Sequence, residues 1–233
     1  MNFGLMVEIL PDLLRAAAVT VQLVSLSLAL GMTLAIPLAV LYVSKRWFLS
    51  LPAMSYVFFF RGTPLLVQIF LVYYGLAQFE FVRFSFLWPY LRVPFICALI
   101  TFVLHTAAYT ANILKGGIRA VDAGQVEAAK ACGMSRFQQY RYILFPQVFC
   151  MVLPAYGNEV VAMLKATSLA STITVMELTG VAGTIVSQTF APYEVFIMAA
   201  FIYLMLALVL TRALGMAERY LNRRRSPAVW ANL

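Results

Sequence analysis

The stretch AAVTVQLVSLSLALGMTLAIPLAVLYV, residues 17–43, contains 27 consecutive residues without one charged side chain. As an α-helix with a rise of 1.5 Å per residue it would be about 40 Å long. The hydrocarbon core of a bilayer is only about 30 Å thick, so such a helix crosses it with length to spare. The stretch therefore predicts a membrane-spanning helix.

Four further apolar stretches extend this prediction along the chain. They lie at about 52–77, 93–115, 147–166 and 194–214, and each is long enough to cross a bilayer. We expect an all-α membrane protein with five transmembrane helices, in which residues 1–233 form a single transmembrane domain. The segment before the first span, FGLMVEILPDLL (residues 3–14), is amphipathic, and we expect it to lie along the membrane surface.

Composition supports a membrane protein and argues against a metalloprotein. Hydrophobic residues make up 63% of the chain and charged residues 11%, which is roughly the reverse of a soluble domain. The three cysteines, Cys97, Cys132 and Cys150, form no CxxC pair, and His105 is the single histidine. We therefore expect no disulfide framework, no metal site and no catalytic residue, and no cofactor bound by this chain itself.

Lysine and arginine residues are distributed unequally between the two sides of the predicted bundle. The connecting segments 44–50, 115–146 and 212–233 hold twelve of the 17, whereas the opposite set holds four and Arg61 lies inside a span. Because cytoplasmic segments carry the excess of Lys and Arg, this asymmetry places the N-terminus outside and the C-terminus in the cytoplasm. The basic tail, Arg223–Arg225, then faces anionic lipid at the inner surface.

The long cytoplasmic connection, residues 116–146, has the pattern of two short helices joined at a glycine. Asp122 can cap the first helix, Gly133 can end it, and Ser135 with Gln138 has the spacing of a capping box. The first helix has a side with almost no side-chain bulk, which suits insertion into a groove on a partner. An ordinary helical hairpin that only connects two spans is the alternative.

The same connection resembles the EAA loop of bacterial ABC importer permeases. The family pattern is EAA, three residues, glycine, nine residues, then Ile-x-Leu-Pro, and this chain departs from it once, with Phe145 in place of leucine. The resemblance implies that the loop docks on an ATPase subunit and couples ATP hydrolysis to transport. The matching residues are Glu127, Ala128, Ala129, Gly133, Ile143 and Pro146.

Three other stretches resemble the histidine/glutamine type of polar amino-acid permease. They are FRGTPL (60–65), LPAYGNE (153–159) and KATSL (165–169), and the first is most similar to permeases for histidine, arginine, lysine, ornithine and opines. The resemblance implies an importer of the bacterial inner membrane that carries polar, basic amino acids or opines. It also implies a second permease subunit, two ATP-binding subunits that hold ATP and magnesium, and an extracytoplasmic solute-binding protein.

Polar side chains at membrane depth are candidates for the substrate pathway. Arg61, His105 and Glu159 lie roughly 14, 15 and 18 Å from the cytoplasmic ends of their spans, close to the bilayer midplane. Gly62 and Pro64 should interrupt the second span and free backbone amides near Arg61, so that Arg61 and Glu159 can bind the two charged groups of an amino acid. The candidate pathway residues are Arg61, Thr63, Gln68, His105, Tyr109, Asn112, Asn158 and Glu159.

Several alternatives stay open from the sequence. Arg61 and Glu159 can pair with each other, His105 can bond a buried carbonyl, and Gln68 and Asn112 can join helices without touching a ligand. An intramembrane enzyme would need a nucleophile–base pair or a metal cluster, for which the sequence offers little. A self-sufficient channel would have no need of a docking loop.

Overall fold

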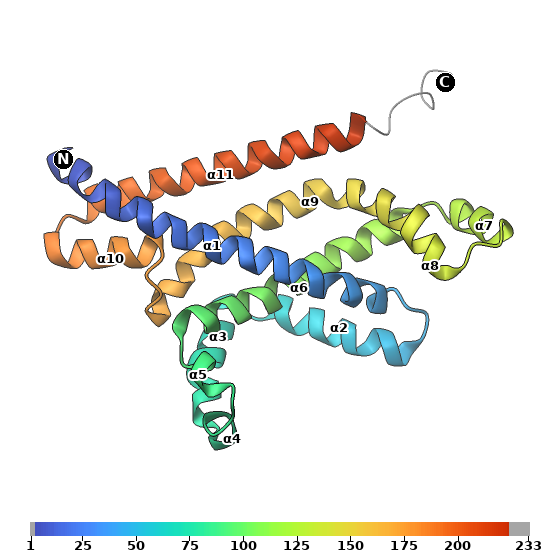
Figure 1. Cartoon of the computed structure of the whole chain (residues 1–233), viewed down its shortest axis with the longest axis horizontal. Helices are drawn as coiled ribbons and strands as arrows, with labels where there is room; N and C mark the ends of the chain where they lie inside the picture. Colours follow the sequence, from blue (N-terminus) through green and yellow to red (C-terminus); the bar gives the residue numbers. More distant parts are fainter. Residues whose placement is uncertain (1–2, 224–233) are drawn as a thin grey trace.

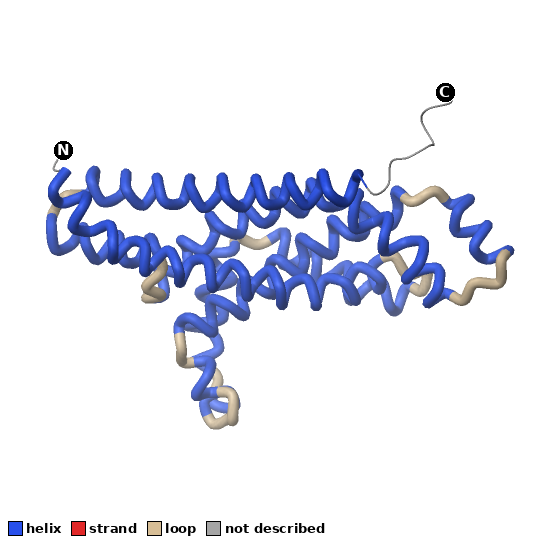
Figure 2. Tube along the Cα trace, turned by 45° about the horizontal axis from the view of Figure 1, so that its top comes forward, coloured by secondary structure: helices blue, strands red, loops and turns tan. Residues whose placement is uncertain are grey.

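The computed structural model describes residues 3–223, and within that range every regular element is a helix (Figures 1 and 2). The long helices all extend along the length of the molecule, and α1 crosses α6 and α9 obliquely (Figure 1). They are α1 (Phe3–Tyr42), α2 (Trp47–Gly62), α6 (Pro94–Ala120), α9 (Phe145–Ala166) and α11 (Pro192–Arg223). The shorter elements are α3 (Leu65–Phe70), η1 (Leu71–Gly75), η2 (Leu76–Gln78), α4 (Glu80–Arg83), α5 (Trp88–Leu91), α7 (Ala123–Ala131), α8 (Arg136–Gln138), η3 (Gln139–Leu144), η4 (Thr167–Ile173) and α10 (Leu178–Thr189).

Four continuous helical segments are long and apolar enough to cross a membrane. They are Phe3–Tyr42, Pro94–Ala120, Arg136–Ile173 and Pro192–Leu221. A fifth span is made by Trp47–Gly62 and Leu65–Gln78 if this pair, bent by 105°, is counted as one. The structure thus has four spans, or five with the bent pair.

The N-terminal segment is part of the first helix, so the expectation of a separate surface helix is wrong. Helix α1 is continuous from Phe3 and passes through Pro11. The reason lies in packing: Ile9 and Leu13 are buried against Leu178 of α10 and Val195 of α11. The apolar face that resembled a membrane-surface helix is covered by other helices of the same chain.

Close contacts hold α6 in the centre of the bundle. Gly31 of α1 faces Thr106 of α6, and a Cβ added at Gly31 would overlap the Thr106 methyl group. Gly117 of α6 likewise faces Val148 and Val152 of α9. Small residues that let two helix backbones approach are typical of packing inside a membrane. Helix α6 is therefore fixed between α1 and α9, and the polar residues it carries have fixed neighbours.

The segment from α3 to α5 leaves the bundle sideways and forms an arm (Figures 1 and 2). Its direction follows from the bend after Gly62. The arm carries large exposed side chains, namely Phe81, Phe84, Phe86 and Tyr90. Aromatic residues of this kind are enriched at membrane–water interfaces, so we expect the arm to lie at such an interface.

Glu177 joins three helices at the end of the bundle that carries the N-terminus. Its side chain is fully buried, and burial raises the pKa of its carboxyl group. Oε1 accepts a hydrogen bond from the Gly180 N–H at 2.8 Å, and thereby caps α10. Oε2 accepts from the Tyr203 hydroxyl at 2.8 Å and from the Thr20 hydroxyl at 3.4 Å. The carboxyl group thus connects α10 to α11 and α1.

We expect Glu177→Ala to lower the free energy of unfolding by about 1–3 kcal/mol, because the half-buried donors on Gly180 and Tyr203 would lose this acceptor. Thermal unfolding of the purified protein measures the effect. Glu80→Ala is the matched control, since Glu80 is exposed on the arm. Equal midpoints for the two variants would contradict the proposed role of Glu177.

Candidate functional site

The second hydrophobic segment breaks at Thr63 and Pro64, as the sequence predicted. Both residues have extended backbone angles, with ψ of 144° at Thr63 and 133° at Pro64. A proline disfavours the helical conformation of the residue before it and has no N–H of its own, so α2 ends and α3 starts in a new direction. The break exposes the last carbonyl groups of α2.

The side chain of Gln68 fills this break. Its Nε2 donates to the Phe60 carbonyl at 2.9 Å, the Thr63 carbonyl at 3.0 Å and the Thr63 hydroxyl at 2.8 Å. Its Oε1 lies 3.2 Å from Nδ1 of His105. Because an amide oxygen can only accept, Nδ1 of His105 carries the proton and donates. His105 thus bonds a side chain of α3 rather than the backbone carbonyl considered above.

Arg61 and Tyr109 extend the same cluster toward the surface of the chain. The guanidinium of Arg61 lies 5.3 Å from the centre of the Tyr109 ring, and the Tyr109 ring stacks on His105 at 4.7 Å. Arg61 is exposed, whereas Gln68 is buried. Five of the predicted residues are therefore brought together by α2, α3 and α6: Arg61, Thr63, Gln68, His105 and Tyr109. We call this group the Arg61 cluster.

Glu159 lies nearby on α9 but bonds a residue that the sequence did not single out. Its Oε1 accepts a hydrogen bond from the Thr106 hydroxyl at 3.1 Å, and both side chains are buried. Within residues 3–223 no ion pair joins Arg61 to Glu159. Thr106 follows His105 directly, and a hydroxyl beside a polar residue at membrane depth was the signal that could have identified it.

Asn158 and Asn112 are placed differently from the Arg61 cluster. Both Asn158 and Glu159 are candidate pathway residues, but Asn158 is exposed whereas Glu159 is turned toward α6. Adjacent residues on an α-helix point about 100° apart, which explains the separation. Asn112 is half-buried on α6, three residues after Tyr109.

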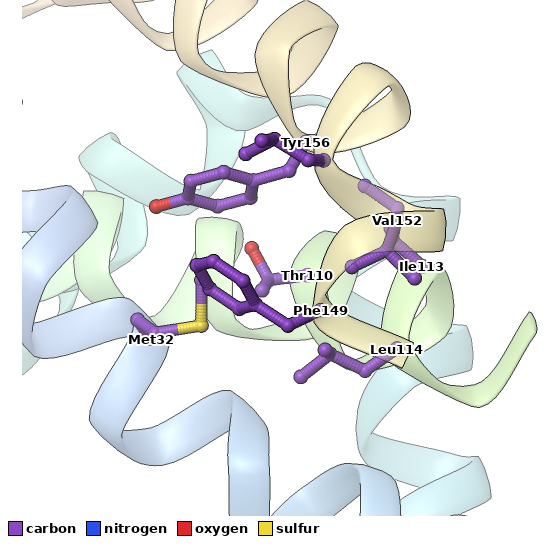
Figure 3. Close-up of a pocket in the computed structure, with 8 residues that line it drawn as sticks. Met32, Thr110, Ile113, Leu114, Phe149, Val152 and Tyr156 are labelled. Atoms are coloured by element: carbon purple, nitrogen blue, oxygen red, sulfur yellow. The ribbon is translucent and has the colours of Figure 1, made fainter. Parts of the chain in front are cut away.

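A small pocket between α1, α6 and α9 is lined by other residues (Figure 3). Figure 3 shows the Thr110 hydroxyl between the rings of Phe149 and Tyr156, and this hydroxyl has no hydrogen-bond partner among the described residues. The pocket measures about 10 Å³, which is room for about one water molecule and too little for an amino acid. In the Arg61 cluster, by contrast, the charged side chain of Arg61 is exposed.

The predicted docking loop protrudes from the end of the bundle opposite the N-terminus (Figure 1). The Asp122 side chain accepts from the Gln125 N–H at 3.2 Å and caps α7. Gln125 does not return this bond as in a capping box, because its side chain accepts from Gln147 at 2.6 Å. At α8 both bonds of the predicted capping box are present, between Ser135 and Gln138.

Gly133 ends α7 in the left-handed conformation, with φ of 75°. Its N–H donates to the Lys130 carbonyl and the Met134 N–H donates to the Ala129 carbonyl, which is the hydrogen-bond pattern of a Schellman motif. Ala129 is buried toward the body of the protein, whereas Glu127 and Ala128 are exposed. Ile143 lies half-buried in η3, and Pro146 is exposed in the first turn of α9. The loop therefore presents part of the EAA sequence to the outside.

The family of the chain follows from a match to a family model. Residues 27–223 match the family described as binding-protein-dependent transport system inner membrane component. The chain belongs to this family. It is therefore a multi-pass membrane component of a transport system that depends on a binding protein, and not an enzyme by itself.

Three relatives show which permeases within this family the chain is similar to. The octopine transport system permease protein OccM of Rhizobium radiobacter is 52% identical over 88% of this chain and 84% of its own length. The nopaline transport system permease protein NocM of Agrobacterium fabrum is 48% identical over 95% and 92%. The histidine/lysine/arginine/ornithine permease protein HisM of Escherichia coli is 39% identical over 87% and 85%. The chain is thus a permease of the amino-acid and opine ABC importer type.

The chain is also similar to solved structures of ABC transporters. A chain of an amino acid ABC transporter crystallised with histidines is 34% identical, with a TM-score of 0.83 over 94% of this chain and 99% of that one. A chain of the MetNI methionine ABC transporter is 17% identical, with a TM-score of 0.76 over 90% and 95%. The second similarity concerns the fold alone.

Proposed function

We propose that this permease imports basic amino acids or opines, with its substrate bound beside the Arg61 cluster. Octopine, nopaline, histidine, lysine, arginine and ornithine appear in the names of its relatives. All of these molecules carry a carboxylate together with a cationic or nitrogen-rich side chain. Arg61 would bind a carboxylate, and Glu159 would bind a cationic group.

One observation carries this proposal: the Arg61 cluster is a polar site at a helix break, and its charged member, Arg61, is exposed. No acidic side chain within residues 3–223 forms an ion pair with Arg61, and its guanidinium is exposed beside Tyr109. A charged side chain at membrane depth marks a pathway for polar molecules. Broken helices at this depth are a recurrent feature of substrate sites in transporters. A second permease subunit would complete the walls of the pathway.

The remaining partners follow from the same proposal. Two ATP-binding subunits would hold ATP and magnesium and would receive the loop 116–146 through Glu127, Ala128, Ala129, Gly133, Ile143 and Pro146. An extracytoplasmic solute-binding protein would deliver the substrate at the opposite face. The complex would lie in the bacterial inner membrane with the N-terminus of this chain outside and its C-terminus in the cytoplasm.

Transport by the reconstituted complex tests the proposed substrate class. We expect ATP-dependent uptake of labelled arginine or octopine into proteoliposomes, which unlabelled lysine inhibits and unlabelled glutamate does not. Uptake without an ATP-binding subunit would instead favour the self-sufficient channel. Efficient uptake of glutamate alone would contradict the substrate class while leaving the permease assignment intact.

The proposed orientation predicts which positions an impermeant thiol reagent can reach in intact cells. In a chain with Cys97, Cys132 and Cys150 replaced by serine, we expect a cysteine at Ser85 to react from outside. A cysteine at Gln138 should react only after the membrane is opened, because the excess of Lys and Arg places that loop in the cytoplasm. Gln188 and Gln138 are both exposed, so a cysteine at Gln188 serves as a second outer position. The reverse pattern would invert the orientation.

A further inference from the structure

A second, larger pocket lies between α1, α6, α9 and α11, next to the docking loop. Its volume is about 550 Å³, within the range of small-molecule sites. Nine of its ten lining residues are apolar or weakly polar, and the tenth is Arg141. The lining residues are Met32, Ile36, Leu114, Arg141, Phe145, Pro146, Val148, Phe149, Cys150 and Leu221. We call this the Arg141 pocket.

The apolar wall of the Arg141 pocket is open rather than buried under other side chains. Phe149 is 51% exposed and Ile36 is 39% exposed, and both lie on membrane-spanning helices. The small pocket of Figure 3 adjoins it, since Met32, Leu114 and Phe149 line both. That inner space holds about one water, so a larger occupant would stop at these three side chains.

Arg141 gives the pocket a positive charge at the end next to the docking loop. Within residues 3–223 no ion pair joins it to an acidic side chain, and its guanidinium lies 6.0 Å from the centre of the neighbouring Tyr142 ring. Glu218 lies one helical turn before Leu221 on α11, yet no ion pair joins it to Arg141. Arginine matches the geometry of a phosphate with two parallel hydrogen bonds. An anionic group is therefore the complementary partner.

We propose that the Arg141 pocket binds an anionic phospholipid of the inner leaflet. The phosphate binds Arg141, and part of an acyl chain lies between α9 and α11 against Phe149 and Ile36. The inner leaflet is the anionic one, and it surrounds this end of the bundle in the orientation proposed above, on which this inference rests.

The size of the pocket favours a lipid chain over a helix of a partner protein. One turn of helix, 5.4 Å long and 10–12 Å across, takes up roughly 400–600 Å³. The pocket therefore holds about one turn, which is too short for a helix that crosses the membrane. A flexible hydrocarbon chain fills such a space without leaving backbone groups unpaired in a lipid environment.

The position of the pocket links lipid binding to the docking loop. Arg141 belongs to η3, which continues directly into α9, and Pro146 is both a pocket residue and the last residue of the EAA-like sequence. A bound lipid would contact η3, α9, α1 and α11 at once. It would thus stabilise the arrangement in which the loop leaves the membrane.

Thermal unfolding of the assembled complex in detergent tests the charge preference. We expect phosphatidylglycerol to raise the unfolding midpoint in a saturable way and phosphatidylcholine to raise it less. Arg141→Gln should weaken the apparent affinity for phosphatidylglycerol about tenfold or more, whereas Arg141→Lys should keep most of the preference. Arg136→Gln is the matched control, because Arg136 is an exposed cation of the same segment and does not line the pocket. Equal lipid stabilisation of all four proteins would overturn the proposal.

The labelling rate of Cys150 measures whether the Arg141 pocket is occupied, because Cys150 lines the pocket. In a complex with Cys97 and Cys132 replaced by serine, we expect phosphatidylglycerol to slow maleimide labelling of Cys150 several-fold. Soluble glycerol phosphate at the same concentration should leave the rate unchanged, which separates a lipid from a free phosphate. Cross-linking of Cys150 to the second permease subunit would assign the pocket to a protein interface instead. Both measurements record binding and not transport, so they stay informative if the proposed substrate is wrong.

Discussion

Gly133→Pro should leave the permease in the membrane but reduce substrate-stimulated ATP hydrolysis by about tenfold or more. Gly133 has φ of 75° and donates its N–H to the Lys130 carbonyl at 2.9 Å. Proline fixes φ near −65° and has no N–H, and in an unsuitable position it costs about 3 kcal/mol or more. We expect α7 to shift in order to relieve this strain, and a shifted α7 would fit the ATPase subunit less well. Because 1.4 kcal/mol corresponds to a factor of ten in rate, a cost of this size would abolish most of the substrate-stimulated ATP hydrolysis.

The matched control for this variant is Gly133→Asn. Asparagine keeps the N–H and tolerates the left-handed conformation, and no heavy atom beyond the adjacent residues lies within 4 Å of the position its Cβ would take. We expect the Gly133→Asn complex to keep most of its stimulated activity. ATP hydrolysis by purified complexes, with and without substrate-loaded binding protein, measures both variants. Normal stimulation in an assembled Gly133→Pro complex would show that the end of α7 does not transmit coupling.

Much of the bundle could be predicted from the sequence because a lipid environment allows few backbone conformations. Uncharged stretches longer than the bilayer thickness have to be helices that satisfy their own backbone hydrogen bonds. The break at Pro64 and the caps at Asp122 and Ser135 were also predictable, since each rests on the local chemistry of one or two residues. The structure contains all three.

Contacts between distant segments could not be predicted in this way. The continuity of residues 3–14 with α1 depends on Leu178 and Val195, which lie more than 160 residues further along the chain. The bond from Thr20 to Glu177 joins residues 157 apart, and that from Thr106 to Glu159 joins residues 53 apart. No periodicity within one helix encodes such pairs. Glu159 could be identified in the sequence by its charge, but its hydrogen-bond donor, Thr106, could be identified only from the structure.

Glu159→Gln should weaken transport of arginine or lysine roughly 10- to 150-fold and that of a neutral amino acid much less. A hydrogen bond to a charged group contributes about 1.5–3 kcal/mol, which corresponds to this range in affinity. Glutamine keeps the shape of the side chain and an oxygen that can accept from the Thr106 hydroxyl, now 3.1 Å away. The change therefore removes the charge while the contact between α9 and α6 can persist.

Two companion variants separate a role in binding from a role in packing. Thr106→Ser keeps the hydroxyl that donates to Glu159, and Thr106→Val removes it but retains the branched shape that fits against Gly31. If Glu159 binds substrate, Thr106→Val keeps the carboxyl group itself and should reduce the preference for arginine over glutamine less than Glu159→Gln does. Uptake of the two amino acids side by side, with the amount of assembled complex measured in each case, gives this ratio.

The structure already limits how a structural role for Glu159 could act. Within residues 3–223 Glu159 is hydrogen-bonded to Thr106 and forms no ion pair with Arg61, which is exposed, so Glu159→Gln would not leave a buried arginine without a counter-ion. A purely structural carboxylate would then be replaced by glutamine with little loss of stability and no change in substrate preference. If Glu159→Gln instead reduced both uptakes equally and impaired assembly, an Arg61–Glu159 pair would have to form in another state of the transport cycle. A selective loss of arginine uptake in a normally assembled complex would leave direct contact with the cationic substrate as the explanation.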